Sequence, residues 1–437
     1  MNRPGTRTTA KMSLALCLGL GFLPAVRAET DENPLTLQDA IGYGLDNNTR
    51  LQGVFSEWQS SREQVAIQSA LPDPTFTYGY YFDSVETRVG PQDQSFALNL
   101  RFPAFGKLSA ARAAAEESAN AAYQHYRQEE LNLIRDIVKA YAELYFVQRN
   151  IATTRDRIRL VRDLEEVART RYTAGSPIAP VLQAQVELGR LEDRLASLED
   201  LLHPARARLN ALLDRSADSP LSITSSLPYR NVGELDPDSL QQTGTSPQIL
   251  QMEAMVAEGS HQVDQAKRAR LPDIILGVTY IDTGPALNPV PDSGKDPVIG
   301  SIGFNLPIWP AKNRARIEAA AYRRTAAEMK LEDRRETLDS EIRQTTFDLR
   351  DAERKISLYR DSLIPKARQS LEVNRQGYEA GGMEFINLID AERMLLEFEL
   401  AYERALADHL IARAELSRLT GTDFLNADGT ASPVGKK

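Results

Sequence analysis

The chain has 437 residues, of which 42% are hydrophobic and 26% are charged, a composition typical of a folded protein rather than a disordered one. Lys and Arg number 52 against 61 Asp and Glu, so the net charge is −9, which argues against a strongly basic nucleic-acid-binding protein. A single Cys and four His nearly exclude zinc fingers, iron–sulfur clusters and disulfide scaffolds, and no apolar run reaches the roughly 18 residues of a membrane-spanning helix.

Residues 1–28 have the pattern of a secretory signal peptide. Three basic residues come first, and Met12 to Leu23 is an apolar run of the usual length for such a signal. Small residues near its end predict cleavage after Ala28, so we expect the mature chain to leave the cytoplasm of a bacterium. An N-terminal membrane anchor is the alternative. Cys17 follows a leucine inside the apolar run, which makes it a poor site for lipid attachment.

An internal repeat organises the rest of the chain. Leu71-Pro72-Asp73 recurs as Leu271-Pro272-Asp273, and Tyr172-Thr173-Ala174-Gly175 recurs as Tyr378-Glu379-Ala380-Gly381. Further matches occur in the same order, at offsets that drift from about 200 to about 207 residues. Matches that stay in register along the chain predict two structural copies with a pseudo-twofold relationship.

Each copy is expected to contain a helix, two strand-like segments, a very long polar helix and a returning helix. The expected helices are 51–70, 107–173 and 177–213 in the first copy and 248–270, 312–379 and 383–419 in the second. At 1.5 Å per residue the long helices span roughly 100 Å, so they must pack side by side as coiled coil. Pro365 should kink or restart the second long helix. The stretch Asp214 to Ser246 links the copies, and the tail after Thr422 is expected to be disordered.

Four segments alternate with the period of a β-strand, and each has one apolar and one mixed or polar face. They cover 75–83, 95–102, 274–282 and 298–306. Segments of this length can cross a bilayer as tilted strands. Two surface hairpins on a soluble helical protein are the alternative, but the nearby helices are too polar to cover the aromatic face. The side chains expected to face lipid are Phe76, Tyr78, Tyr80, Phe82, Phe96, Leu98, Leu100, Leu276, Val278, Ile302 and Phe304.

Four strands cannot close a barrel, and open sheet edges cannot stand in lipid. Closure must therefore come from other chains, and three copies would supply twelve strands. The loops Ser84 to Asp93 and Thr283 to Pro297 would then face the outside of the cell. Length, charge and the repeat do not fix the number of copies.

In this duplicated plan, and in the Tyr-x-x-Gly motif that precedes a helix start in both copies, the chain resembles the TolC family of outer-membrane efflux factors. The resemblance covers essentially the whole mature sequence, and the second copy, from Tyr378 to Gly381 and on to Ala391, matches well. The segment Phe102-Pro103-Ala104-Phe105-Gly106-Lys107-Leu108 is similar to the sequences of the heavy-metal branch of the family, the CzcC/CusC-like proteins.

The resemblance implies a mainly α-helical fold with a small β part: a homotrimer with a twelve-stranded outer-membrane barrel continuous with a periplasmic helical tunnel. It also implies a periplasmic adaptor and an inner-membrane pump of the RND type as partners, with no cofactor and no enzyme activity. The implied divisions are a signal peptide at 1–28, equatorial segments and upper helices at 29–74 and 214–272, membrane hairpins at 75–103 and 274–308, long helical hairpins at 104–213 and 309–421, and a flexible tail at 422–437.

In the family, the Tyr-x-x-Gly turns form the periplasmic tip, and acidic residues just beyond them line a closed entrance. The matching acid of the second copy is Asp390, and Asn387 stands where the family can carry a second acid. In the first copy the matching positions are Pro180 and Gln183, so one acidic ring is expected, which would attract cations. A solvated or Arg-paired carboxylate is the alternative.

The remaining tip residues are expected to act as structural parts of this entrance. Tyr172 and Tyr378 would bond across neighbouring helices or pack the seam between them. Gly175 and Gly381 would supply the turns that reverse the helices.

Other chemistry finds little support in the sequence. The four His lie far apart, so solvated or packed single histidines are expected rather than a metal site. The Arg-rich stretch Arg155 to Arg171 is interleaved with acids and is interpreted as an intersubunit or solvent face. No phosphate-binding loop occurs, so a partner must supply the energy for transport.

Three functions therefore remain open for this chain. The favoured one is a passive export duct for metals or drugs. A type I protein-secretion duct and a soluble periplasmic coiled-coil adaptor or scaffold are the alternatives, and the membrane-length aromatic hairpins argue against the adaptor.

Overall fold

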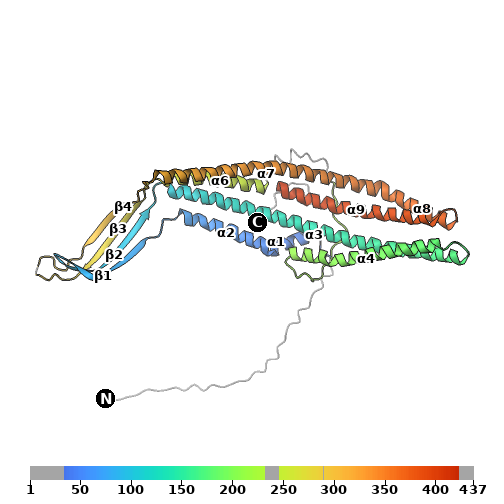
Figure 1. The fold of residues 1–437 in the computed structure, drawn as a ribbon, viewed down its shortest axis with the longest axis horizontal. Helices are drawn as coiled ribbons and strands as arrows, with labels where there is room; N and C mark the ends of the chain where they lie inside the picture. Colours follow the sequence, from blue (N-terminus) through green and yellow to red (C-terminus); the bar gives the residue numbers. More distant parts are fainter. Residues whose placement is uncertain (1–33, 232–245, 289, 423–437) are drawn as a thin grey trace, which may run out of the picture.

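The computed structural model describes residues 34–231, 246–288 and 290–422. The expected signal peptide with Cys17, a part of the expected linker and nearly all of the expected tail lie outside these residues. Figure 1 shows an elongated molecule with a β-sheet at one end, long helices through the middle and two helical turns at the other end. The fold is mainly α-helical with one small sheet, which confirms the predicted fold class.

Four helices form a layer next to the sheet (Figure 1). The layer consists of α2 (Thr49–Ser69), α3 (Lys107–Thr173), α6 (Pro247–Arg268) and α7 (Pro310–Leu358). Helix α3 packs between α2 and α6, and α6 packs between α3 and α7. With 67 residues, α3 is about 100 Å long and runs from the sheet to the far end of the molecule.

Two antiparallel helical hairpins form the half of the molecule away from the sheet. The first joins α3 to α4 (Ala179–Leu212), and the second joins α8 (Ile364–Glu379) to α9 (Phe385–Thr420). Helix α9 packs against α3 as well as α7 and α8, so it connects the two copies of the repeat.

The interruption expected at Pro365 takes the form of a bulge rather than a break. A π-helical turn, Tyr359–Leu363, joins α7 to α8 directly before this proline. Proline lacks an N–H, and its ring clashes with the carbonyl four residues earlier, which lies within the π-turn. The wider turn accommodates both effects without ending the helix.

The largest apolar cluster surrounds the middle of α3, where Ile137 and Tyr141 are fully buried against α1 (Leu37–Asn47) and α9. Segments from far apart in the chain close over it. The Leu35 N–H donates to the Ser222 carbonyl at 2.8 Å, and the Tyr141 hydroxyl donates to the Leu35 carbonyl at 2.9 Å. Burial of each large apolar side chain contributes about 2 kcal/mol to the stability of the fold. The cluster therefore holds the middle of α3 in place.

The sheet has four antiparallel strands in chain order, β1 (Thr75–Thr87), β2 (Gly90–Phe102), β3 (Ile274–Thr283) and β4 (Val298–Phe304). Strand β2 pairs with β3, so the hairpins of the two copies lie side by side and β1 and β4 form the edges. The first hairpin is longer than predicted, because pairing continues to Thr87 and Gly90. The prediction of a loop from Ser84 to Asp93 was therefore wrong. A register shift between Tyr80 and Val85 hides the alternation there.

A buried carboxylate ties the sheet to the helices. Asp273 accepts hydrogen bonds from Lys107 Nζ at 2.6 Å, from the Ala104 N–H at 3.0 Å and from Asn305 Nδ2 at 3.2 Å. Ala104 and Lys107 lie just before and at the start of α3 in the first copy, and Asn305 directly follows β4 in the second, so both copies meet at Asp273. The equivalent residue of the first copy, Asp73, is exposed.

Candidate functional site at the helical tips

The two helical turns lie together at the end of the molecule opposite the sheet (Figure 1). Gly175 and Gly381 follow the ends of α3 and α8 and have φ angles of +101° and +81°. This left-handed conformation strains any residue with a Cβ, so the two glycines allow the chain to reverse where the repeated motif places them.

The two tyrosines of that motif have different surroundings. Tyr378 is 5% exposed, its ring meets the edge of Phe385 at 5.2 Å, and the Arg171 guanidinium lies 4.5 Å from its ring centre. Arg171 also donates a hydrogen bond to the main-chain carbonyl of Glu379, so the first hairpin binds the turn of the second. Tyr172 is 46% exposed. Within one chain, Tyr378 is thus the tyrosine that joins the hairpins.

Asn387 and Asp390 lie one turn apart on the exposed face of α9, close to the tip. Asp390 Oδ1 is 3.3 Å from Arg393 Nη1, and its side chain is 60% exposed. Arg393 also bonds to the carboxylate of Glu187 on α4, which is almost fully buried. The Asp390 carboxylate is therefore solvated, beside a cation that is already engaged with the other hairpin.

A second acid of α9 is buried in the seam between the hairpins. Glu392 is fully buried, and neither of its carboxylate oxygens has a hydrogen-bond partner among the described residues. Burial raises the pKa of Glu392 to about 7, and the nearby carboxylate of Glu187 raises it further. The positive charges of Arg157, 3.8 Å away, and of Arg393 lower it. Arg157 also pairs with Glu399, so its charge is shared between two acids.

Most of the residues expected to face lipid lie on one face of the sheet. The rows across it are Phe76–Leu98–Val278, Tyr78–Phe96–Tyr280, Leu100–Leu276–Ile302 and Phe102–Ile274–Phe304. Tyr80 continues the alternation of β1, whereas Phe82 follows the last regular pair and its side is not fixed by the register. The opposite face carries a polar row, Asn99–Gly277–Ser301.

Comparison with known proteins assigns the family. The family described as "Outer membrane efflux protein" matches residues 41–215 and 241–422, one match for each copy of the repeat. The chain belongs to the outer membrane efflux protein family. It is therefore a channel of the outer membrane that reaches into the periplasm and carries efflux substrates, and it is not an enzyme. Channels of this family are trimers that pair with adaptor and inner-membrane pump proteins.

Individual relatives align over nearly the full chain. The cobalt-zinc-cadmium resistance protein CzcC of Cupriavidus metallidurans is 22% identical over 92% of this chain and 94% of its own length. The outer membrane protein TolC of Vibrio cholerae is 23% identical over 88% of this chain and 90% of its own. Among solved structures, VceC of the same species superposes with a TM-score of 0.73 at 19% identity, over 89% of this chain and 96% of that one. CusC gives 0.73 at 17% identity, over 88% and 92%.

The sequence pattern does not reveal the buried charges of this efflux channel, and Arg155 to Arg171 was expected to form a solvent or intersubunit face. That assignment was wrong for Arg157, whose side chain is 12% exposed and pairs within the chain. Its position offered a signal, because it comes three residues after Thr154 and four before Val161, both buried. Glu392 likewise follows the apolar Leu388 and Ile389 at helical spacing.

The described residues contain no group of three or more potential metal ligands from His, Cys, Asp and Glu. His409 is fully buried beside Tyr229, with ring centres 5.0 Å apart, and His203 lies at the surface 3.2 Å from Asp218. None of the helices in the part of the chain that is described has the length and apolar character needed to cross a bilayer.

Proposed function

We propose that this channel is the outer-membrane duct of a heavy-metal efflux system, in which an RND-type pump and a periplasmic adaptor deliver divalent cations to it. The observation that carries the proposal is the match to the cobalt-zinc-cadmium resistance protein, which spans more than nine-tenths of both chains. The duct moves its cargo passively, since the energy comes from its partners.

We further propose how three copies assemble. The edge strands β1 and β4 of neighbouring copies pair, which closes a twelve-stranded barrel with no free edge. The hairpins at 75–103 and 274–308 form this barrel with their aromatic face toward lipid. The helical hairpins at 104–213 and 309–421 form the tunnel, and 29–74 and 214–272 form its upper helices and equatorial collar.

The periplasmic entrance in this proposal lies at the hairpin tips. Three copies of Asp390 form an acidic ring, and Asn387 lies one turn nearer the tip. Exposure of both side chains in a single chain supports this arrangement. Gly175 and Gly381 form the turns, Tyr378 holds the hairpins together, and the exposed Tyr172 is free to contact a neighbouring copy.

The cargo is tested in a host strain that lacks the gene for this chain. Restoring the gene should raise tolerance to Co²⁺, Zn²⁺ or Cd²⁺ and lower the amount of metal retained by the cells. Tolerance to hydrophobic drugs should stay unchanged. Restored drug tolerance or protein secretion without any effect on metals would contradict the metal cargo and leave the duct itself intact. The relative named "Toxin and drug export protein A", 25% identical over 55% of this chain, makes that a real alternative.

A further inference from the structure

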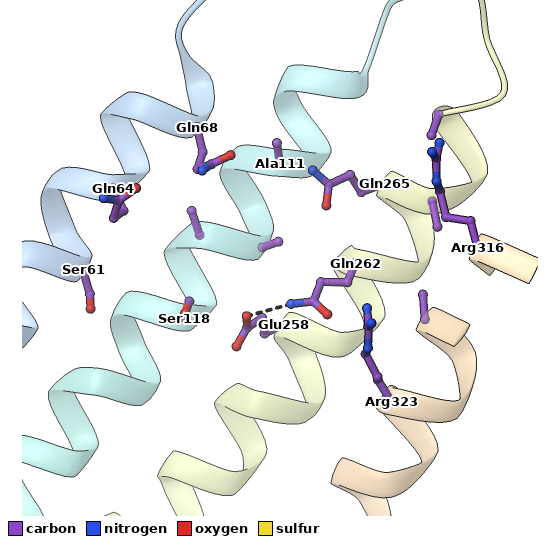
Figure 2. A pocket seen from close by; sticks show the side chains of 15 residues that line it. Ser61, Gln64, Gln68, Ala111, Ser118, Glu258, Gln262, Gln265, Arg316 and Arg323 are labelled. Atoms are coloured by element: carbon purple, nitrogen blue, oxygen red, sulfur yellow. Dashed lines mark hydrogen bonds between the residues drawn. The ribbon is translucent and has the colours of Figure 1, made fainter. Parts of the chain in front are cut away.

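The layer of four helices is hollowed next to the sheet. Side chains from α2, α3, α6 and α7 line a space of about 670 Å³ (Figure 2). Short residues leave the space open, among them Ala111 on α3 and Ala320 on α7, and glutamines of α2 and α6 surround it. We name this space the sheet-proximal hollow.

The sheet-proximal hollow lies on the side of the molecule that faces the interior of the duct. A second hollow of about 730 Å³ shares Gln68, Gln265 and Arg316 with it and extends to Arg101. Arg101 belongs to the polar face of β2, because the side chains on either side of it in the strand belong to the apolar rows. Since the apolar face is the one we assign to lipid, the hollows open toward the lumen.

Two arginines of α7 dominate the charge of the hollow. Arg316 and Arg323 both line it, seven residues apart on one helix face (Figure 2). Both side chains are exposed, and neither forms an ion pair within the part of the chain that the structure describes. Neutral amides and alanines surround them, so their guanidinium groups remain available to a ligand.

No ion pair joins the acid of the hollow to either arginine within the described residues. Glu258 is the one acid among the 15 lining residues, and it accepts a hydrogen bond from Gln262 at 2.8 Å. Burial raises its pKa, and the bonds from Gln262 and Ser118 only partly offset this. In the second hollow, Arg101 and Lys107 share the single carboxylate of Asp273, while Asp73 lies exposed at the rim.

We propose that Arg316 and Arg323 of three copies form an arginine girdle inside the duct that binds multivalent anions carrying phosphate or carboxylate groups. Each guanidinium offers a fork of donors that matches such oxyanions, and the glutamine amides supply further donors. Two cations per chain in a trimer place six positive charges around one lumen. The girdle raises the local concentration of anions in the sheet-proximal part of the duct. The proposal rests on the duct function and not on the identity of the cargo.

The test compares the intact trimer with the double variant Arg316→Gln and Arg323→Gln in planar bilayers. Under an about tenfold KCl gradient at low ionic strength, the variant should show a potassium-to-chloride permeability ratio about threefold higher than the wild type. Arg316→Lys with Arg323→Lys should keep the wild-type ratio. Arg314→Gln is the matched control, because Arg314 is exposed on α7 like Arg316 and Arg323 but does not line the hollow.

Binding supplies a readout that does not need an open entrance. Inorganic pyrophosphate, titrated calorimetrically into the detergent-solubilised trimer, should bind the wild type and the Arg314→Gln variant, and bind the double variant at least about tenfold more weakly. Equal binding and equal selectivity in all variants would overturn the proposal. So would a double variant that no longer forms trimers, because the arginines would then be pairing between copies. The metal-tolerance assay is independent of these outcomes, so the two proposals can fail separately.

Discussion

At the scale of single residues, the most unusual group is Glu392. Its position in α9 belongs to the apolar stripe, where Leu388, Leu395 and Leu396 are buried, yet it carries a carboxylate without a hydrogen bond among the described residues. A buried charge needs a full partner, and Arg157 is shared with Glu399. The protonated form is therefore favoured more strongly than in an ordinary glutamate, with a pKa of about 7.

This predicts a pH dependence of stability. The folded-state pKa of about 7 exceeds the ordinary value of 4.5, so the stabilising effect of protonation is complete below about pH 4.5 and is lost as the pH rises through 7. The loss amounts to at most about 3 kcal/mol per chain. Glu392→Gln should therefore melt at a higher temperature than the wild type at pH 8, with a smaller difference at pH 5.

Thermal unfolding of the detergent-solubilised trimer, followed by circular dichroism at both pH values, measures this effect. Glu397→Gln is the control, because Glu397 is exposed on the same helix. If Glu392→Gln and the wild type respond to pH in parallel, Glu392 does not titrate in this range.

Asp390 gives a second prediction at this scale. Removing an acidic ring at the entrance should weaken block of the channel by multivalent cations, because the ring concentrates them. Asp390→Ala should raise the concentration of Co²⁺ that halves the single-channel current by about tenfold. Glu384→Gln, an exposed acid at the same turn, serves as the control. Unchanged block of Asp390→Ala would remove Asp390 from the entrance.

At the scale of elements, the two copies share a plan but not their details. The first long helix is continuous, whereas the second contains the π-turn before Pro365. The Asp273 junction exists in the second copy, while the equivalent Asp73 is exposed. The two copies therefore differ at the π-turn and at the Asp273 contacts, where single side chains set the local geometry. They share the apolar patterns that set helix packing.

A charged side chain on the aromatic face of the sheet tests the orientation of the strands. A lysine at Leu98 would stand on the face assigned to lipid and cost about 2–4 kcal/mol per chain near the bilayer midplane. Leu98→Lys should therefore reduce the amount of heat-stable trimer in the outer membrane. Asn99→Lys is the matched control, since the next residue of the strand points to the polar face. Normal assembly of Leu98→Lys, measured by membrane fractionation, would count against the assigned facing.

At the scale of the whole molecule, a single chain leaves much apolar surface uncovered. Phe76, Ile302 and Phe304 are each more than half exposed on the sheet, and Trp309, which directly precedes α7, and Tyr322 near the start of that helix are more exposed still. Lipid and neighbouring copies would cover these surfaces in the proposed trimer. The duct would then combine an acidic entrance with an arginine girdle near its exit, so that different parts of one lumen favour opposite charges.

The duplicated plan, the approximate lengths of the helices and the alternating faces of the strands could all be predicted from the sequence. These follow from local rules: apolar residues recur with the period of a helix or a strand, and Gly and Pro mark where elements end. The reversals at Gly175 and Gly381 belong to the same class, because the φ angle each requires depends on the local chain alone.

The contacts between polar residues of different helices could not be predicted, because they depend on how the helices pack. Arg157 and Glu392 are distant in the chain and become neighbours because α3 packs on α9. Tyr378 is buried and Tyr172 is not, because Tyr378 packs into an apolar cluster to which both helical hairpins contribute. The arginine girdle depends on four separate helices sharing one hollow. Contacts of this kind depend on how rigid elements pack across the whole fold, which no short stretch of sequence encodes.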